Sequence, residues 1–432
     1  MIRLRISDNN RYIVLDDGKQ TPFFWLADTA WQLMHRLNRE EADHYLATRA
    51  RQRFTVIQAV ALAELDGIGT PNAYGDLSLA DADPTRPNDA YFEHVDFIID
   101  RAAEKGLRIA LLPTWGDKIP GVRNPGPPIF NPDNAGIYGE WIGRRYRDKP
   151  IIWVLGGDRP VATEEQFAIW RNMAAGIHRG DGGRHLMTFH PDGPSSSSRY
   201  FHNENWLSFN MLQTGHQGRH VDNYRMVEHD YALIPTKPVL DGEPNYEDHP
   251  VMSPKWTWQE GEAWFGAHDI RKSAWRAVLA GACGHTYGCH PVWQMWEPKH
   301  PVHNHVRTPW REAIELEGAQ QMHHLRDLME SRPMLHRIPD QSMLIDAPGP
   351  EDGARHVRAL RSMDGSHAFI YTPIGQAVRV DLSAMRGPVT AAWYDPRTGE
   401  SHAIGRFQPA HREPFVPPTH GDQADWVLVL DA

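Results

Sequence analysis

The sequence has few cysteines, no long apolar run and no recognisable export signal. Only two of its 432 residues are cysteines, Cys283 and Cys289, and an extended strand would hold them roughly 20 Å apart. We therefore expect no disulfide to stabilise the fold. No segment approaches the ~18 uninterrupted apolar residues of a membrane-spanning helix, and the N-terminus lacks the apolar core of a signal peptide. These absences predict a cytoplasmic protein, unless a signal was removed from the chain.

Basic tracts are also missing. The formal net charge is -10, and the lysines and arginines are scattered, which argues against nucleic acid and anionic membranes as partners. A hydrophobic content of 41% is too high for disorder, and the length favours about two globular domains. A neutral or weakly charged small molecule fits this composition best.

Eight apolar segments alternate with amphipathic helical segments over most of the chain. The predicted strands span residues 23–27, 54–60, 107–112, 150–157, 186–189, 206–211, 239–240 and 284–288. Helices between consecutive strands force parallel pairing through right-handed crossovers, so the pattern predicts an α/β fold, a (β/α)8 TIM barrel. A doubly wound open sheet is the main alternative, but no glycine-rich phosphate loop follows the first strand.

Two smaller units flank the predicted barrel. A hairpin at residues 10–25, with Asp-Gly in its turn, precedes the barrel within a catalytic domain at 1–332. Residues 341–432 predict a small antiparallel β-sandwich domain, because short alternating strands are separated by Gly, Pro and Asp turns. These strands are expected at 367–371, 378–382, 391–394 and 426–430. The expected role of this domain is to support the barrel.

Two acidic residues follow predicted strands in the same way. Asp158 follows the fourth strand and two glycines, and Glu243 ends the seventh strand beside Gly242. The C-terminal ends of barrel strands meet at one mouth, so we expect the two carboxylates to face each other. Carboxylates about 5 Å apart suit retaining glycoside hydrolysis, with Glu243 as nucleophile and Asp158 as acid/base. Asp241 is expected one layer deeper, in the barrel interior on the same side as Glu243.

Aromatic and polar side chains at other strand ends are candidates for substrate binding. Aromatic rings stack on the apolar faces of sugars, and polar groups bind their hydroxyls. The aromatic candidates are Trp31, Trp115, Tyr287, Trp293 and Trp296. The polar candidates are Asp28, Gln58, His190, Asn210, Gln213 and His216.

A histidine-rich segment raises the alternative of a metal-dependent hydrolase. It contains His285, His290, His300, His303 and His305. Barrel metallohydrolases usually carry a His-x-His pair on the first strand, where this chain offers only Asp28. We therefore predict no catalytic metal and no cofactor. A non-catalytic carbohydrate-binding barrel is a further alternative from another class.

Four motifs are shared with one known family. LADTAW (26–31), WVLGGD (153–158), DGEP (241–244) and GHTYG (284–288) resemble motifs of the apiosidase-like glycoside hydrolases. The resemblance covers nearly the whole chain and implies a (β/α)8 barrel followed by a β-sandwich labelled as collagen-binding. In the characterised branch the substrate is the apiose linkage to galacturonic acid in a pectic polysaccharide.

The resemblance also bears on the catalytic residues. The family uses an Asp and a Glu, and by matching motifs it implies Asp158 and Glu243 in this chain. Other barrel glycosidases usually end strand four with Asn-Glu, so Asp158 is a shorter acid at this place. The expected function is exo-acting, retaining hydrolysis of a glycosidic bond in a plant-type oligosaccharide.

Overall fold

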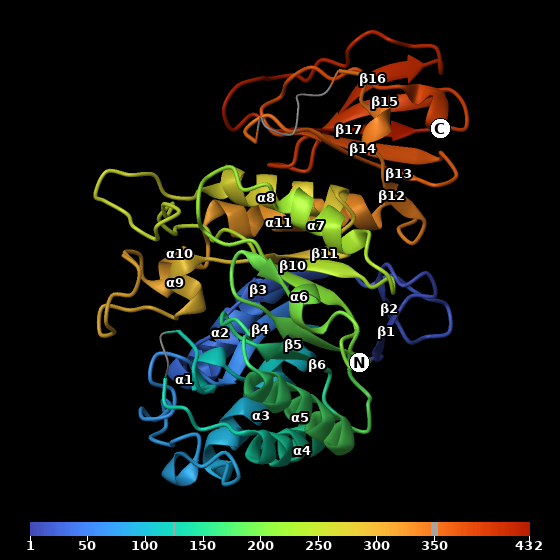
Figure 1. Ribbon diagram of the computed structural model, residues 1–432. Helices are drawn as coiled ribbons and strands as arrows, with labels where there is room; N and C mark the ends of the chain where they lie inside the picture. Colours follow the sequence, from blue (N-terminus) through green and yellow to red (C-terminus); the bar gives the residue numbers. More distant parts are fainter. Residues whose placement is uncertain (124–125, 347–352) are drawn as a thin grey trace.

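Eight parallel strands form the centre of the larger domain (Figure 1). The computed structural model describes residues 1–123, 126–346 and 353–432. The strands are β3 (Trp25–Thr29), β4 (Val56–Leu62), β5 (Arg108–Thr114), β6 (Ile151–Gly156), β7 (Met187–His190), β9 (Asn210–Gln213), β10 (Val239–Glu243) and β11 (Gly284–Tyr287). Their order around the sheet follows the chain, with β11 beside β3. The predicted barrel is confirmed.

The barrel closes between β7 and β9 through a seam of few hydrogen bonds. The backbone nitrogen of Ser208 donates to Met187 O over 2.7 Å, and Thr188 Oγ1 donates to Phe209 O over 2.7 Å. A two-residue strand, β8 (Ser195–Ser196), pairs antiparallel with β9. The cylinder is therefore nearly complete.

Helical segments surround the barrel. They are α1 (Leu33–Arg36), α2 (Arg39–Arg51), α3 (Asp89–Glu104), α4 (Pro132–Tyr146), α5 (Glu164–Asp181), α6 (Ser198–Phe201), α7 (Asn223–Tyr231), α8 (Ala267–Leu279), α9 (His290–Trp293), α10 (Trp310–Ala313) and α11 (Glu317–Glu330). Asn38 begins α2 with a complete capping box, as does Thr163 at α5. Such boxes satisfy backbone N–H groups that the helix leaves unpaired.

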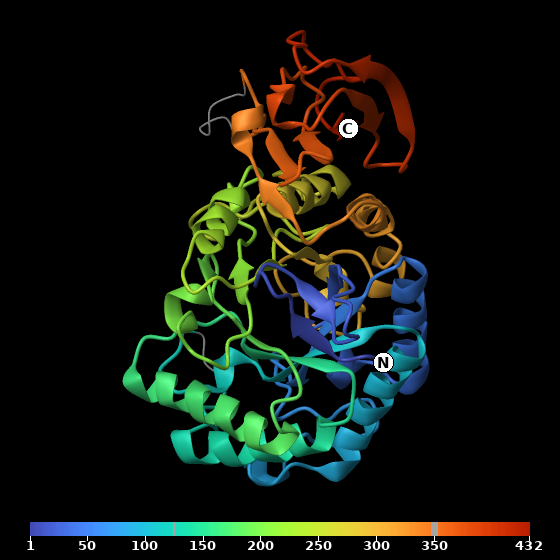
Figure 2. The same cartoon turned by 90° about the vertical axis from the view of Figure 1, so that its right-hand side faces the viewer.

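The N-terminal segment lies against the end of the barrel where the strands begin (Figure 2). Its hairpin differs from the prediction, because β2 (Ile13–Leu15) pairs mainly with β1 (Leu4–Ile6). The predicted partner beyond the Asp-Gly turn contributes an isolated bridge, Val14 to Pro22. The segment from Trp25 is unavailable for the hairpin because it is the first barrel strand.

The smaller domain contains a six-stranded antiparallel sheet. Its strands are β12 (Arg337–Pro339), β13 (Arg358–Ser362), β14 (His367–Thr372), β15 (Val389–Tyr394), β16 (Ser401–Phe407) and β17 (Trp426–Asp431). One face packs on the barrel, with Phe369 and Val429 joining the barrel core. Connecting segments cover the other face, where Val378 bridges to Phe415. The predicted strand at 378–382 thus appears only as isolated bridges.

A buried ion pair joins the two domains. Arg271 of α8 binds both carboxylate oxygens of Asp425, at 2.7 and 3.0 Å, and Tyr371 donates its hydroxyl to the same carboxylate. Trp275 stacks on the Tyr371 ring with centroids 6.0 Å apart. The C-terminal sheet is therefore fixed to the outside of the barrel beside α8 and α11 (Figure 1).

Both cysteines are free and buried, on either side of β11. In the described part of the chain, no helix is long and apolar enough to cross a membrane.

The ion pair between the domains gives a test of the interface. Asp425→Ala is expected to lower the free energy of unfolding by about 3–5 kcal/mol, because it leaves the Arg271 guanidinium buried without its carboxylate. Urea unfolding followed by circular dichroism measures the change. Asp364→Ala, which removes an exposed partner of Arg386, should unfold at nearly the wild-type urea concentration. Equal midpoints for the two variants would contradict the structural role of the pair.

Candidate active site

A turn of unusual backbone geometry brings Asp158 to the barrel mouth. Gly156, Gly157 and Asp158 all have positive φ, at 88°, 129° and 48°. A Cβ on Gly156 would lie 2.2 Å from the backbone oxygen of His190, so only glycine fits there. Left-handed conformations are costly for residues with side chains, and such strain concentrates at functional sites.

A bulge in β10 directs Glu243 to the same place. Asp241 pairs with Leu212 and Glu243 pairs with Gln213, which leaves Gly242 as an extra residue. The bulge breaks the alternation of side chains, so Asp241 and Glu243 point to opposite faces. Asp241 accepts hydrogen bonds from Thr214 and from Asn223 of the outer helix α7. The prediction that Asp241 faces the barrel interior is therefore wrong, and burial raises its pKa to about 7.

The side-chain amide of Gln213 lies between the two predicted catalytic carboxylates. Its Nε2 donates to Asp158 Oδ1 over 2.9 Å and lies 3.2 Å from Glu243 Oε1. These distances place Asp158 Oδ1 and Glu243 Oε1 at most about 6 Å apart, an upper limit that admits the ~5–5.5 Å between carboxyl groups in retaining glycosidases. The structure thus brings Asp158, Glu243 and Gln213 together.

Two imidazoles contact the Glu243 carboxylate. His190 Nε2 lies 3.0 Å from Oε2, and His216 Nε2 lies 3.4 Å from Oε1. Burial alone would raise the pKa of Glu243, but these two imidazoles outweigh it and lower the pKa to about 2. Hydrogen bonding to the charged form has this effect on a carboxyl group. Glu243 is therefore ionised at neutral pH.

Asp158 has the opposite electrostatic environment. Burial and then the negative charge of Glu243 raise the pKa of Asp158, against the lowering effect of Arg159, whose Nη1 lies 3.0 Å from Oδ2. The Asp158 side chain is 36% exposed, whereas that of Glu243 is 8% exposed. Two neighbouring carboxyl groups with divergent pKa values are suited to different roles, one as acid and one as anion.

Aromatic rings line one side of this pair. The Trp31 ring lies 5.0 Å from that of Trp115 and meets His190 edge-on at 5.4 Å. Trp293 is more distant and donates its indole N–H to His290 Nδ1 over 3.1 Å. Trp296 is buried beyond α9. The structure therefore places Trp31 and Trp115 against the site, while Trp293 is connected to it through other rings.

The remaining polar candidates occupy different positions. Gln58 lies beneath Glu243 and donates to the backbone oxygen of Gly242 over 2.9 Å. Asn210 begins β9, three residues before Gln213, and its amide oxygen lies 3.2 Å from His202 Nδ1. Asn210 therefore points toward His202, which follows α6, and away from the mouth of the barrel.

Asp28 and Tyr287 also point away from the mouth, contrary to expectation. Asp28 is buried against the outer helix α2, where it pairs with Arg49 at 2.6 Å. Tyr287 donates its hydroxyl to Glu247 over 2.6 Å and lies near the same Arg49 guanidinium. Both side chains stabilise the packing between barrel and helices, because a buried cation needs several partners.

Three rings that follow β10 surround the predicted residue His216 but are not among the predicted site residues: those of Tyr246, His249 and Trp256. His216 lies between Tyr246 and His249, with ring centroids at 4.5 and 4.3 Å. Trp256 lies 6.2 Å from His216 and is 44% exposed. The dense aromatic and histidine content of the loop after Glu243 is the signal that could have identified these residues.

Residues that could hold a metal lie elsewhere. Within the ranges 1–123, 126–346 and 353–432, one group of three side chains has this potential: His323, His324 and Asp327 of α11. The histidines of the predicted metal alternative are not part of it. The active-site region contains two carboxylates, an amide and imidazoles.

The glycine turn before Asp158 gives a matched pair of variants. Gly156→Ala is expected to lower kcat/KM for an aryl glycoside at least ~100-fold, because its methyl group would displace the turn that positions Asp158. Gly75→Ala serves as control, since Gly75 has the same φ of 88° but nothing within 4 Å of an added Cβ. The control should retain activity, with a stability loss of about 1–2 kcal/mol. Equal losses of activity would rule out the steric explanation.

Comparisons with known proteins agree on the family. The family model "Apiosidase-like, catalytic domain" matches residues 7–336, and "Putative collagen-binding domain of a collagenase" matches residues 338–431. None of the curated proteins compared with the chain matches it significantly.

Two solved structures resemble the chain over nearly its whole length. A structure named "Glycoside hydrolase" is 33% identical with a TM-score of 0.89, covering 99% of this chain and 96% of its own. A glycoside hydrolase family 5 structure from Bacteroides vulgatus is 31% identical with a TM-score of 0.89, covering 99% and 93%. Together with the family match, these relatives show that the chain is an enzyme that hydrolyses glycosides. It belongs to the apiosidase-like glycoside hydrolases.

Proposed function

We propose that the protein is an exo-acting, retaining glycosidase that removes a terminal sugar from a plant-type oligosaccharide. The observation that carries the proposal is the single Gln213 amide nitrogen within 3.2 Å of both carboxylates. Inverting enzymes need a wider gap, ~6.5–9.5 Å, to admit the attacking water between the carboxyl groups.

The first half of the reaction uses both carboxyl groups at once. The Glu243 carboxylate attacks the anomeric carbon while the Asp158 carboxylic acid gives its proton to the glycosidic oxygen. The bond to that oxygen breaks, the alcohol leaves, and a glycosyl ester of Glu243 forms. The low pKa of Glu243 and the raised pKa of Asp158 support this division of roles.

The second half releases the sugar. Asp158, now a carboxylate, takes a proton from water as the water oxygen attacks the anomeric carbon. The ester bond breaks, Glu243 recovers its negative charge, and Asp158 is protonated again. His190 and His216 stabilise the Glu243 carboxylate as it leaves, and Gln213 holds the two acids in place.

The surroundings of Glu243 support attack at a chain end. Only 8% of its side chain is exposed, and rings of Trp31, Tyr246 and His216 lie around the site. A nucleophile buried this deeply is reached more easily by one terminal sugar than by the middle of a polymer. The exposed indole of Trp256, whose ring lies 6.2 Å from that of His216, offers a stacking surface for the next sugar.

Variants of the two acids test the mechanism. Glu243→Ala should lose turnover of aryl glycosides, and azide should restore it with formation of a glycosyl azide. Asp158→Ala should retain more activity on substrates with good leaving groups, because these need less protonation. Proton NMR of the first product should show a retained anomeric configuration. Wild-type rates in both variants, or an inverted first product, would refute the mechanism.

The pH dependence of kcat/KM tests the two environments. Activity should fall as pH rises through the raised pKa of Asp158, because the acid is lost, and Asp158→Asn should remove this limb. Glu243, with a pKa of about 2, should stay ionised at low pH, so the enzyme should remain active there. His216→Phe should raise that pKa and shift the acidic limb to higher pH. His420→Phe, on the surface of the C-terminal domain, should leave both limbs unchanged; identical profiles for the two histidine variants would contradict the assignment.

A further inference from the structure

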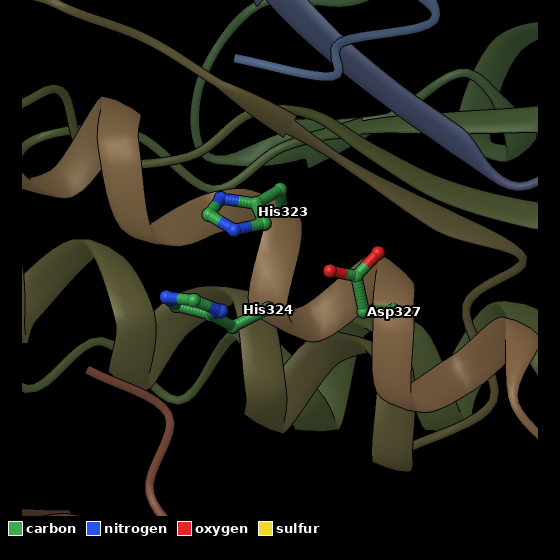
Figure 3. A group of neighbouring side chains, drawn as sticks. All are labelled: His323, His324 and Asp327. Atoms are coloured by element: carbon green, nitrogen blue, oxygen red, sulfur yellow. The ribbon is translucent and has the colours of Figure 1, made fainter. Parts of the chain in front are cut away.

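Helix α11 carries three side chains that could bind a metal ion on adjacent turns. Figure 3 shows His323 and His324 side by side, with Asp327 on the following turn. One ligand atom from each residue lies within 4.8 Å of the others, and the two imidazole centroids are 4.0 Å apart. All three side chains are partly exposed. The glycosidase mechanism uses none of them.

The donor atoms of the group are already oriented. His323 Nδ1 lies 2.7 Å from the backbone oxygen of Gln320, and a carbonyl can only accept, so Nδ1 carries the proton. The lone pair of His323 is therefore on Nε2. Ligand histidines in metal sites usually have this second hydrogen bond, which fixes their tautomer. Asp327 pairs with Arg53 at 2.9 Å, so a metal ion would take the place of this guanidinium.

We propose that His323, His324 and Asp327 form a binding site for a divalent transition-metal ion of the zinc type. Two imidazoles and one carboxylate suit such borderline ions better than magnesium or calcium, which prefer oxygen ligands. Bonds of about 2.0–2.2 Å require the three atoms to approach more closely than they do here. Rotation of the partly exposed His324 and Asp327 side chains toward Nε2 of His323 would bring the atoms closer without moving the helix.

The surroundings leave room for an ion and its remaining ligands. The three residues line a groove of 560 Å³ between α11 and the C-terminal sheet, where Thr398 and Ser401 supply hydroxyls. Gly399 lies so close to His324 that an added Cβ would be 2.6 Å from Nδ1. Tyr394 donates its hydroxyl to the His324 backbone oxygen over 2.9 Å. An ion here would therefore lie beside the contact between α11 and the C-terminal domain.

Charges around the group are balanced. Arg53 opposes a cation, but it is half exposed and can move into solvent. The other charged side chains in the groove, Arg332 and Asp431, pair with each other at 2.6 Å. The carboxylate of Asp327 thus supplies the attraction for the ion.

Zinc binding by the full-length protein tests the site. Protein stripped with a chelator should bind one Zn²⁺ per chain in competition with a chromophoric chelator. His323→Ala and Asp327→Asn should each weaken binding at least ~10-fold. The matched control is His336→Ala, which removes an exposed histidine outside the group and should bind as wild type. Co²⁺ should give visible absorption bands in the wild type that both site variants lose.

Two further readouts decide the outcome. Zn²⁺ should raise the melting temperature of the wild type, because an ion that binds the folded state stabilises it, and should not raise that of His323→Ala. Both site variants should hydrolyse aryl glycosides at the wild-type rate, which shows that they fold. The proposal would be overturned if the wild type did not bind zinc stoichiometrically. It would also be overturned if His323→Ala and Asp327→Asn retained activity and bound zinc as tightly as the wild type.

Discussion

One shared amide defines the chemistry of this enzyme. Gln213 Nε2 contacts Asp158 and Glu243 at once, so the distance between the two acids is limited by a single side chain. Two carboxyl groups this close cannot both ionise without cost. Imidazoles around Glu243 favour its ionised form, and Asp158 is protonated more readily. The proposed retaining mechanism uses this difference.

Both acids depend on irregular backbone. In a regular strand, successive side chains point to alternate faces of the sheet. With regular backbone throughout, neither acid would reach its observed position at the mouth of the barrel. Three successive positive φ angles turn Asp158 toward Gln213, and the extra residue in β10 turns Glu243 inward. Glycine supplies both irregularities because it lacks the Cβ that would collide with neighbouring strands.

The outside of the barrel has its own polar structure. Asp28, Arg49, Tyr287 and Glu247 form a buried network behind β3 and β11, and Arg271 joins Asp425 across the domain boundary. Each of these ion pairs needs all of its partners, because removing one partner leaves a buried charge unpaired. The C-terminal sheet packs on α8, and the groove at α11 lies at the same domain boundary.

The amino-acid sequence alone predicts the barrel, the antiparallel character of the smaller domain, and the strands that lead to Asp158 and Glu243. It does so because strand and helix periodicities differ and because glycine marks the strand ends. Only the tertiary structure decided which side chains face the mouth. The barrel strands that carry these candidates, β3, β9 and β11, are buried at every position, so their sequences carry no contrast between inside and outside. Asp28, Tyr287 and Asn210 were therefore predicted as site residues. Their side chains instead point toward partners on other segments of the chain: Asp28 toward Arg49, Tyr287 toward Glu247 and Asn210 toward His202.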